Sequence, residues 1–309
     1  MGGRRVTLLG LGTYRSRDAA HSARIAAAAG CPLIDTAPVY GHGTHQSAIA
    51  STLEAHPQVR IASKVGHMTP GHAEVAVSSG ALATEEARGL HSIAADYVRH
   101  QIAMNRLELR RPRLDLVFLH NPDHHHDGDR DGLHDRIRGG FIALEEARAE
   151  GLITGYGVAT WSGFTEAFSV PDLLRLSREA SGSPETGLAA VQLPVSLVNI
   201  APIKDALTGS GPLAEAHEAG LEVWASAPLH GGKLVHLVNE RLAHHISDGA
   251  SPAEAALMVT ASAPGLTGML ISASSAGHWL SAASVAGRPP LPENRLKDIS
   301  DLLLSRENA

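Results

Sequence analysis

The sequence predicts an α/β protein in which eight parallel strands close into a single (β/α)₈ barrel. Short, almost wholly apolar segments alternate with longer alanine-rich segments of helical periodicity along the chain. Eight such pairs are present, and strands that are apolar on both faces are typical of a parallel sheet covered by helices. The length of 309 residues also suits one barrel of the TIM type, which typically takes about 250 residues.

The expected elements follow from this alternation. Strands are expected at residues 6–11, 32–36, 59–63, 114–120, 154–159, 190–195, 221–225 and 268–272. Helices are expected at 18–29, 46–55, 92–106, 138–150, 172–180, 213–219, 234–247, 252–262 and near 294–304. We therefore treat 1–309 as one domain, with extended loops after strand three (69–89) and strand four (121–140).

A doubly wound nucleotide-binding fold is the main alternative, since it also alternates strands and helices. That fold needs a glycine-rich phosphate fingerprint after an early strand. Gly10 and Gly12 supply its first two glycines, but position 15, where the third glycine belongs, is Arg15. The barrel is therefore the better prediction.

Composition limits the classes of partner. Hydrophobic residues make up 43% and charged residues 19%, which is ordinary for a globular protein. The net charge of -6 argues against nucleic acid or an anionic membrane as the main partner. The single cysteine, Cys31, excludes an intrachain disulfide, and no run approaches the roughly 20 apolar residues of a membrane span. The apolar stretch at 6–11 is too short for a secretion signal, so we expect a cytoplasmic protein.

Four polar residues stand where expected strands end or shortly after. Asp35 closes strand two, and Tyr40 follows it by five residues within a Pro/Gly turn. Lys64 follows strand three, and His120 ends strand four. Neighbouring strands of a barrel deliver such side chains to the same mouth, where barrel active sites are built. We therefore predict that these four residues form a catalytic group.

These residue types suit proton donation to a carbonyl oxygen. A tyrosine has a pKa of about 10, and a lysine ammonium beside it favours the phenolate. A carboxylate keeps the lysine charged and in place, and a histidine donates a hydrogen bond to the substrate oxygen. Each residue alone also has a structural interpretation, such as a buried ion pair or a packed turn. Their occurrence on consecutive strand ends favours the catalytic one.

Three further features near the expected strand ends bear on the site. His67 and Trp161 follow strands three and five and are expected to line a substrate pocket. The run 123–127 (DHHHD) invites a metal interpretation, but adjacent histidines point in different directions, whereas metal ligands are usually separated in sequence. We expect no metal there, and a solvated loop facing the substrate instead.

Several segments together resemble the aldo-keto reductases, and they occur in the same order over nearly the whole chain. They are 10–14 (GLGTY), 35–41 (DTAPVYG), 63–64 (SK), 119–122 (LHNP), 155–161 (GYGVATW), 191–194 (VQLP) and 227–229 (APL). The resemblance implies that Tyr40 is the general acid, that Lys64 and Asp35 tune it, and that His120 orients the carbonyl.

The resemblance also implies a nicotinamide cofactor, NADPH with NADH as the alternative, extended across the barrel mouth. The residues it assigns to the cofactor are Gly12, Thr13, Tyr14, Asp35, Gln192, Leu229, Ser272, Ser274 and Ser275. The substrate would contact Tyr40, His67, His120 and Trp161.

The chain departs from the family pattern where the cofactor is held. Ala159 and Thr160 replace a Ser-Asn pair, Ser226 stands where a tyrosine often stacks on the nicotinamide, and Ala227 replaces a serine. The loop 272–278 contains no Lys or Arg for a 2′-phosphate, which an arginine holds best. These changes weaken the expected preference for NADPH.

The leading functional hypothesis is reduction of an aldehyde or ketone to an alcohol, on a small molecule that the sequence does not identify. A biosynthetic pathway is one interpretation of its setting. A barrel repurposed for acid/base chemistry, such as isomerisation, dehydration or cyclisation, is a second hypothesis, motivated by the altered cofactor positions. A non-catalytic binding subunit is the third. The oligomeric state is left open.

Overall fold

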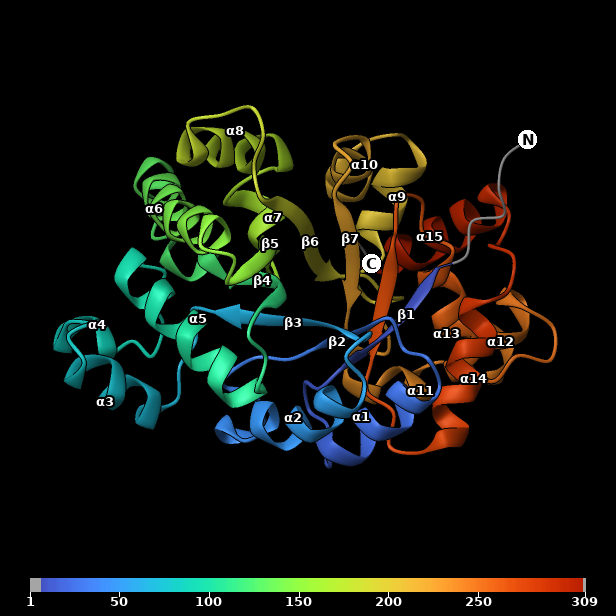
Figure 1. Ribbon diagram of the computed structural model, residues 1–309. Coiled ribbons are helices and arrows are strands. Elements are labelled where there is room, and N and C mark those ends of the chain that lie inside the picture. Colours follow the sequence, from blue (N-terminus) through green and yellow to red (C-terminus); the bar gives the residue numbers. More distant parts are fainter. Residues whose placement is uncertain (1–6, 308–309) are drawn as a thin grey trace.

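The computed structural model describes residues 7–307, and in it eight parallel strands form a closed barrel in chain order (Figure 1). The strands are β1 (Leu8–Gly12), β2 (Leu33–Asp35), β3 (Arg60–Val65), β4 (Leu114–His120), β5 (Ile153–Ala159), β6 (Leu188–Pro194), β7 (Glu222–Ser226) and β8 (Gly268–Ile271). Parallel pairing of β8 with β1, in which Leu8 lies opposite Gly268, closes the ring. The predicted barrel is confirmed, because the doubly wound alternative has an open sheet.

Helices surround this barrel and connect its strands (Figure 1). They are α1 (Ala19–Ala28), α2 (His45–Ala55), α3 (Pro70–Ser78), α4 (Thr84–Ala87), α5 (Ala95–Leu109), α6 (Arg130–Ala149), α7 (Gly163–Glu166), α8 (Val170–Ser181), α9 (Ala201–Leu207), α10 (Gly211–Glu218), α11 (Leu234–Leu237), α12 (Glu240–Ile246), α13 (Pro252–Ala261), α14 (Ala276–Ala286) and α15 (Glu293–Glu307), with 3₁₀ turns η1 (Tyr40–Gly43), η2 (Pro122–His125) and η3 (His230–Gly232). None of the helices in this described part is both long and apolar enough to cross a membrane.

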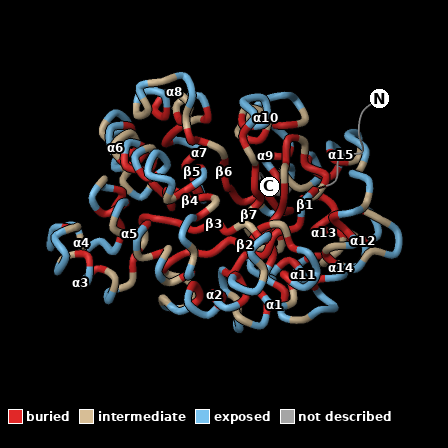
Figure 2. The backbone as a smooth tube through the Cα atoms, viewed as in Figure 1, coloured by how far each residue is buried: buried red, intermediate tan, exposed pale blue. Residues whose placement is uncertain are grey.

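Two apolar layers hold the barrel together. The larger lies between the strands and the surrounding helices, whose outer faces are exposed (Figure 2). The smaller fills the barrel interior and includes Leu116, Phe118 and Trp224. Gly268 makes room for the Trp224 ring, since a Cβ there would lie 2.4 Å from a ring carbon. Side chains therefore fill the barrel beneath its mouth, as in other barrels of this type.

Every expected strand is present, and its ends shift by at most two residues. Only β4 has the expected bounds, Leu114–His120. Val6, the first residue expected in strand one, lies outside the described residues. The small shifts leave the carboxyl ends of the strands where the sequence predicted them.

The prediction of a loop over residues 69–89 was wrong, because this segment contains α3 and α4. Thr69 caps α3 by accepting a hydrogen bond from His72 N, and Pro70 occupies the first turn, where its missing N–H costs nothing. The Gly- and Ser-rich composition had suggested a loop. These capping residues were the signal for a helix.

The expected loop 121–140 was also too long. Helix α6 begins at Arg130, because the Asp129 carboxylate caps it by accepting from Gly132 N. The expected helix 234–247 is two helices, α11 and α12, and Asn239 caps the second of them. Helices α7, α9 and α14 were not predicted either.

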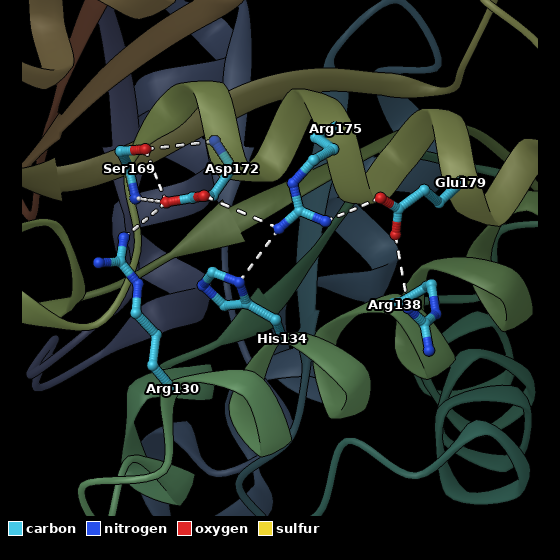
Figure 3. A network of polar contacts seen from close by, with 7 residues as sticks. All are labelled: Arg130, His134, Arg138, Ser169, Asp172, Arg175 and Glu179. Atoms are coloured by element: carbon cyan, nitrogen blue, oxygen red, sulfur yellow. Dashed lines mark hydrogen bonds and ion pairs between the residues drawn. The ribbon is translucent and has the colours of Figure 1, made fainter.

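Helices α6 and α8 lie side by side on the outside of the barrel and are joined by a polar network (Figure 3). Arg130 Nη2 donates to Asp172 Oδ2 over 2.8 Å, and Arg138 Nη1 donates to Glu179 Oε2 over 3.4 Å. Ser169 and Asp172 form a reciprocal capping box at the start of α8. The interface between α6 and α8 therefore contains both ion pairs and the cap of α8.

Candidate active site

A cavity of about 740 Å³ opens at the carboxyl ends of the strands. Each of the eight strands, or the loop that follows it, contributes to the lining. Such a volume lies in the usual range of about 300–1,000 Å³ for cofactor and substrate sites. The position is the one at which barrel enzymes build their active sites.

Beneath the cavity lies a buried ion pair between Lys64, which is 1% exposed, and Asp35, which is 3% exposed. Lys64 Nζ lies 2.6 Å from both carboxylate oxygens of Asp35 and donates to Thr36 O over 3.0 Å. Gln192 Nε2 adds a hydrogen bond to Asp35 Oδ1 at 3.0 Å. Burial lowers the pKa of Lys64, and the Asp35 carboxylate opposes that effect.

Tyr40 lies above this pair, with Lys64 Nζ 5.1 Å from the centroid of its ring. The chain turns sharply after it, because Gly41 and His42 both have left-handed backbone, with φ of 59° and 54°. Gly41 also leaves space for His45, whose ring would lie 2.0 Å from a Cβ at that position. Burial, followed by the negative charge of Asp35, raises the pKa of the Tyr40 phenol, which therefore keeps its proton at neutral pH.

His120, the last residue of β4, faces Tyr40 across the cavity. Their ring centroids lie 6.0 Å apart, and the rings meet edge to face at 85°. His120 is 8% exposed, and its Nδ1 has no hydrogen-bond partner among the described residues. Burial, followed by the positive charge of Lys64, lowers the pKa of His120, so the imidazole is neutral.

Most of the residues selected from the sequence line this cavity. They are Gly12, Tyr14, Asp35, Tyr40, His67, His120, Trp161, Gln192, Leu229 and Ser272.

Four others do not line it. Lys64 lies beneath the surface, and Thr13 is fully buried and donates to Thr36 Oγ1 over 2.9 Å. Ser275 caps α14, and Ser274 Oγ lies 3.3 Å from a ring nitrogen of His278. Thr13, Ser274 and Ser275 therefore have structural partners that the sequence did not reveal.

Arg15 is a cavity residue that the sequence interpretation missed as a binding group. Its guanidinium carbon lies 5.2 Å from the centroid of the Tyr14 ring. A Cβ at Gly231 would lie 2.9 Å from Arg15 Nη1, so the side chain reaches from the loop after β1 to the loop after β7. No acidic residue of the described chain pairs with it. Its position directly after the GLGTY segment was the available signal.

Three residues of the run 123–127 make contacts within the protein, whereas the sequence suggested a solvated loop facing the substrate. Asp123 accepts hydrogen bonds from Thr160 Oγ1 at 2.6 Å and Ser162 Oγ at 3.2 Å. His124 and His125 pack against the rings of other histidines. Within residues 7–307, no group of three or more His, Cys, Asp or Glu side chains is arranged to hold a metal ion.

Known proteins share this architecture. The structure matches the thermostable aldo-keto reductase Tm1743, solved with the inhibitor epalrestat, with a TM-score of 0.66 and 20% identity, covering 95% of this chain and 94% of that one. It matches an aldo/keto reductase from Klebsiella pneumoniae, solved with NADP and acetate, with a TM-score of 0.65 and 20% identity, covering 96% and 92%. These likenesses support the fold.

Sequence comparison gives the family. A D-threo-aldose 1-dehydrogenase from Pseudomonas sp. is 26% identical over 139 residues, which span 43% of this chain and only 40% of that protein. The sequence profile of the Aldo/keto reductase family matches residues 2–303. Because this match spans nearly the whole chain, the protein belongs to the aldo/keto reductase family.

Proposed function

We propose that this protein reduces an aldehyde or ketone to an alcohol with NADPH, or alternatively NADH, as the hydride donor. The observation that carries the proposal is the placement of Tyr40 and His120 at one cavity, above the buried Asp35–Lys64 pair. The substrate would be a small molecule in the cytoplasm, and the same site would catalyse the reverse oxidation.

The residues around the cavity fit a nicotinamide dinucleotide. Gln192 offers a buried amide beside the catalytic group, and Gly12 lines the cavity without a side chain that would project into it. At the other end, Arg15 lies next to Gly231 and provides a positive charge for a pyrophosphate. When bound, the nicotinamide supplies the hydride that reduces the carbonyl carbon.

His120 and Tyr40 would hold the carbonyl oxygen between them. A neutral imidazole donates one hydrogen bond, and the protonated phenol donates another. Both groups line the cavity, so each can donate to a negative charge that develops on a substrate oxygen bound there. His67 and Trp161, which is 46% exposed, would contact the rest of the substrate.

Proton transfer would run from the Tyr40 hydroxyl to the alkoxide oxygen. A phenol whose pKa is raised by burial holds its proton until a stronger base arrives, and an alkoxide is such a base. The Lys64 ammonium then stabilises the phenolate that remains. Asp35 keeps that ammonium charged despite its burial.

The preference for NADPH over NADH would be small. The loop 272–278 contains neither Lys nor Arg. Arg288, which follows α14, is directed toward α13, where Nη2 lies 3.7 Å from Glu254 Oε1. A 2′-phosphate therefore finds no dedicated arginine near this loop. The NADP in the Klebsiella structure supports the dinucleotide class and leaves the preference to measurement.

Two measurements test the function. Titration of the protein with NADPH and with NADH, followed by fluorescence, gives the two dissociation constants. A panel of aldehydes is then supplied with the tighter cofactor while the cofactor absorbance is followed. Binding together with aldehyde-dependent loss of absorbance is the expected result. Absence of binding of either cofactor at millimolar concentration would overturn the proposal.

A further inference from the structure

Five histidine rings gather in and behind the cavity wall, at the carboxyl ends of β3 and β4. They belong to His67, His91, His120, His124 and His125. His67 lies 4.5 Å from His91, 4.8 Å from His120 and 4.7 Å from His124, measured between ring centroids. His91 in turn lies 4.8 Å from His125. The cluster thus connects the segment before α5 with the strand end that carries His120.

His91 reaches this cluster through a short antiparallel bridge between its own segment and the end of β3. On one side Met68 N donates to Leu90 O over 3.0 Å, and on the other Ser92 N donates to Gly66 O over 3.0 Å. The backbone on both sides of His91 is therefore held, and its ring is directed toward the end of β4.

Both ring nitrogens of His91 have partners. Nε2 lies 2.7 Å from the backbone oxygen of His120, and Nδ1 lies 2.9 Å from Nε2 of His125. A carbonyl oxygen only accepts, so Nε2 of His91 carries the hydrogen. Burial lowers the pKa of His91 to about 3, so the ring is neutral and its bare Nδ1 accepts from His125. The ring therefore has one defined tautomer.

Gly66 makes this contact feasible. A Cβ at position 66 would lie 2.9 Å from both His91 Nε2 and His120 O. Gly66 also has a φ of 137°, which residues with a side chain rarely adopt. The backbone directly after β3 is thus shaped so that an imidazole can reach the carbonyl at the end of β4.

We propose that His91 is a positioning residue for His120, holding the backbone of the carbonyl-orienting histidine through a hydrogen bond to its carbonyl oxygen. The inference rests on the proposed reduction, because it concerns the same site. On this proposal, a residue of the loop after β3 fixes the position of His120 at the end of β4.

The His120 ring needs such support. Its Nδ1 has no partner among the described residues, so no hydrogen bond from that nitrogen fixes the ring. The next residue, Asn121, turns into left-handed backbone with a φ of 50°. The carbonyl bound by His91 lies between the ring and this turn. A displacement of about 1 Å at a reacting group can cost about 100-fold in rate.

Two substitutions separate positioning from packing. In His91→Gln, the amide N–H and the amide oxygen replace the donor and the acceptor of the neutral ring. In His91→Phe, the ring shape is kept and both hydrogen bonds are lost. His21→Gln, at an exposed histidine of α1, is the matched control.

With 4-nitrobenzaldehyde and NADPH as probes, we expect His91→Phe to lower kcat about tenfold or more, while the NADPH dissociation constant stays within about twofold. His91→Gln should recover most of the wild-type kcat, and His21→Gln should match the wild type. Equal losses in both His91 variants, or a kcat loss that follows weaker NADPH binding, would overturn the positioning role.

A second measurement does not depend on activity. In ring NMR spectra of the protein without cofactor, His91→Phe should shift the signals of His120, whereas His91→Gln should leave them near their wild-type positions. Unshifted His120 signals in His91→Phe would overturn the proposal, whatever the turnover. If the wild type reduces no aldehyde, the proposed function fails, and the NMR comparison still decides whether His91 positions His120.

Discussion

Lys64 carries its charge in an almost fully buried position, and its partners explain why this is tolerated. An ammonium has three N–H donors, and here they are directed to the two oxygens of Asp35 and to Thr36 O. A buried ion pair of this kind adds little net stability, but the loss of one partner leaves an uncompensated charge. Its position beneath Tyr40 is the reason for assigning the pair a role in the proposed reduction.

Tyr40→Phe tests the assigned acid. The variant keeps the ring and its packing but has no proton to donate, so we expect carbonyl reduction to fall by about 100-fold or more. The NADPH dissociation constant should remain nearly unchanged, which fluorescence titration checks. Tyr14→Phe, which alters a neighbouring phenol in the same cavity, is the control. Reduction by Tyr40→Phe at the wild-type rate would mean that another group donates the proton.

Asp35→Asn tests the support of the lysine. Without the carboxylate, burial lowers the pKa of Lys64 unopposed, and we expect turnover to collapse as the ammonium loses its charge. The free energy of unfolding should also fall by about 3–5 kcal/mol, measured by urea denaturation. Asp96→Asn, at an exposed ion pair on α5, should change stability by less than about 1 kcal/mol. Wild-type turnover in Asp35→Asn would show that the pair is only structural.

Helices α6 and α8 show how caps and ion pairs place an outer layer against the barrel (Figure 3). Ser169 begins α8 by accepting from Asp172 N, while Asp172 Oδ2 accepts from Ser169 and Arg130. On α6, His134 Nδ1 lies 3.2 Å from Arg175 Nη2, and because an arginine only donates, the imidazole nitrogen is the acceptor. The interface therefore combines a helix cap, ion pairs and a histidine contact.

Asp172→Ala should destabilise the protein by about 1–2 kcal/mol at neutral pH, because it removes half of the capping box and an ion pair. Partial burial raises the pKa of Asp172, but hydrogen bonds from Ser169 outweigh this and leave it below its ordinary value. A lowered folded pKa gives stability that is present above the unfolded pKa, about 4, and is lost as the pH falls through the folded pKa.

The difference in unfolding free energy between wild type and Asp172→Ala should therefore shrink below about pH 4. Urea denaturation at a series of pH values measures it, with Asp298→Ala on α15 as an exposed control. A difference that stays constant down to the acid limit of folding would contradict the assigned ionic role.

The cavity depends on the whole barrel, since each of the eight strands, or the loop that follows it, contributes to its lining. A cofactor bound across this mouth would contact loops that are far apart in sequence and would stabilise the folded state by mass action. At a concentration 100 times its dissociation constant, NADPH should add about 2.7 kcal/mol. For a chain of this length, Tm should rise by about 4 °C.

Thermal unfolding with and without NADPH measures this shift. Tyr40→Phe should show the same increase, because the phenol hydroxyl acts on the substrate oxygen. No increase in Tm for the wild type at saturating NADPH would count against cofactor binding at this mouth.

The sequence predicted most of the barrel because parallel strands buried on both faces form continuous apolar runs, as in β4. The ends of those runs located Asp35, Lys64 and His120, and a short motif located Tyr40. Loop composition was a poorer guide, since α3 and the first turns of α6 lie in segments rich in glycine and polar residues. In these segments single capping contacts determined where the helices begin, although the composition had suggested loops.

Periodicity and motif order along the chain were therefore sufficient for the fold class, the family and the group of polar strand ends. These properties are local, because each strand and each motif is read from neighbouring residues. The partners of Arg15 and His91 were decided by the folded chain, since Gly231 and the His120 carbonyl lie far from them in sequence. Barrel closure brings such distant loops to one mouth, and contacts made across it leave no periodic trace in the sequence.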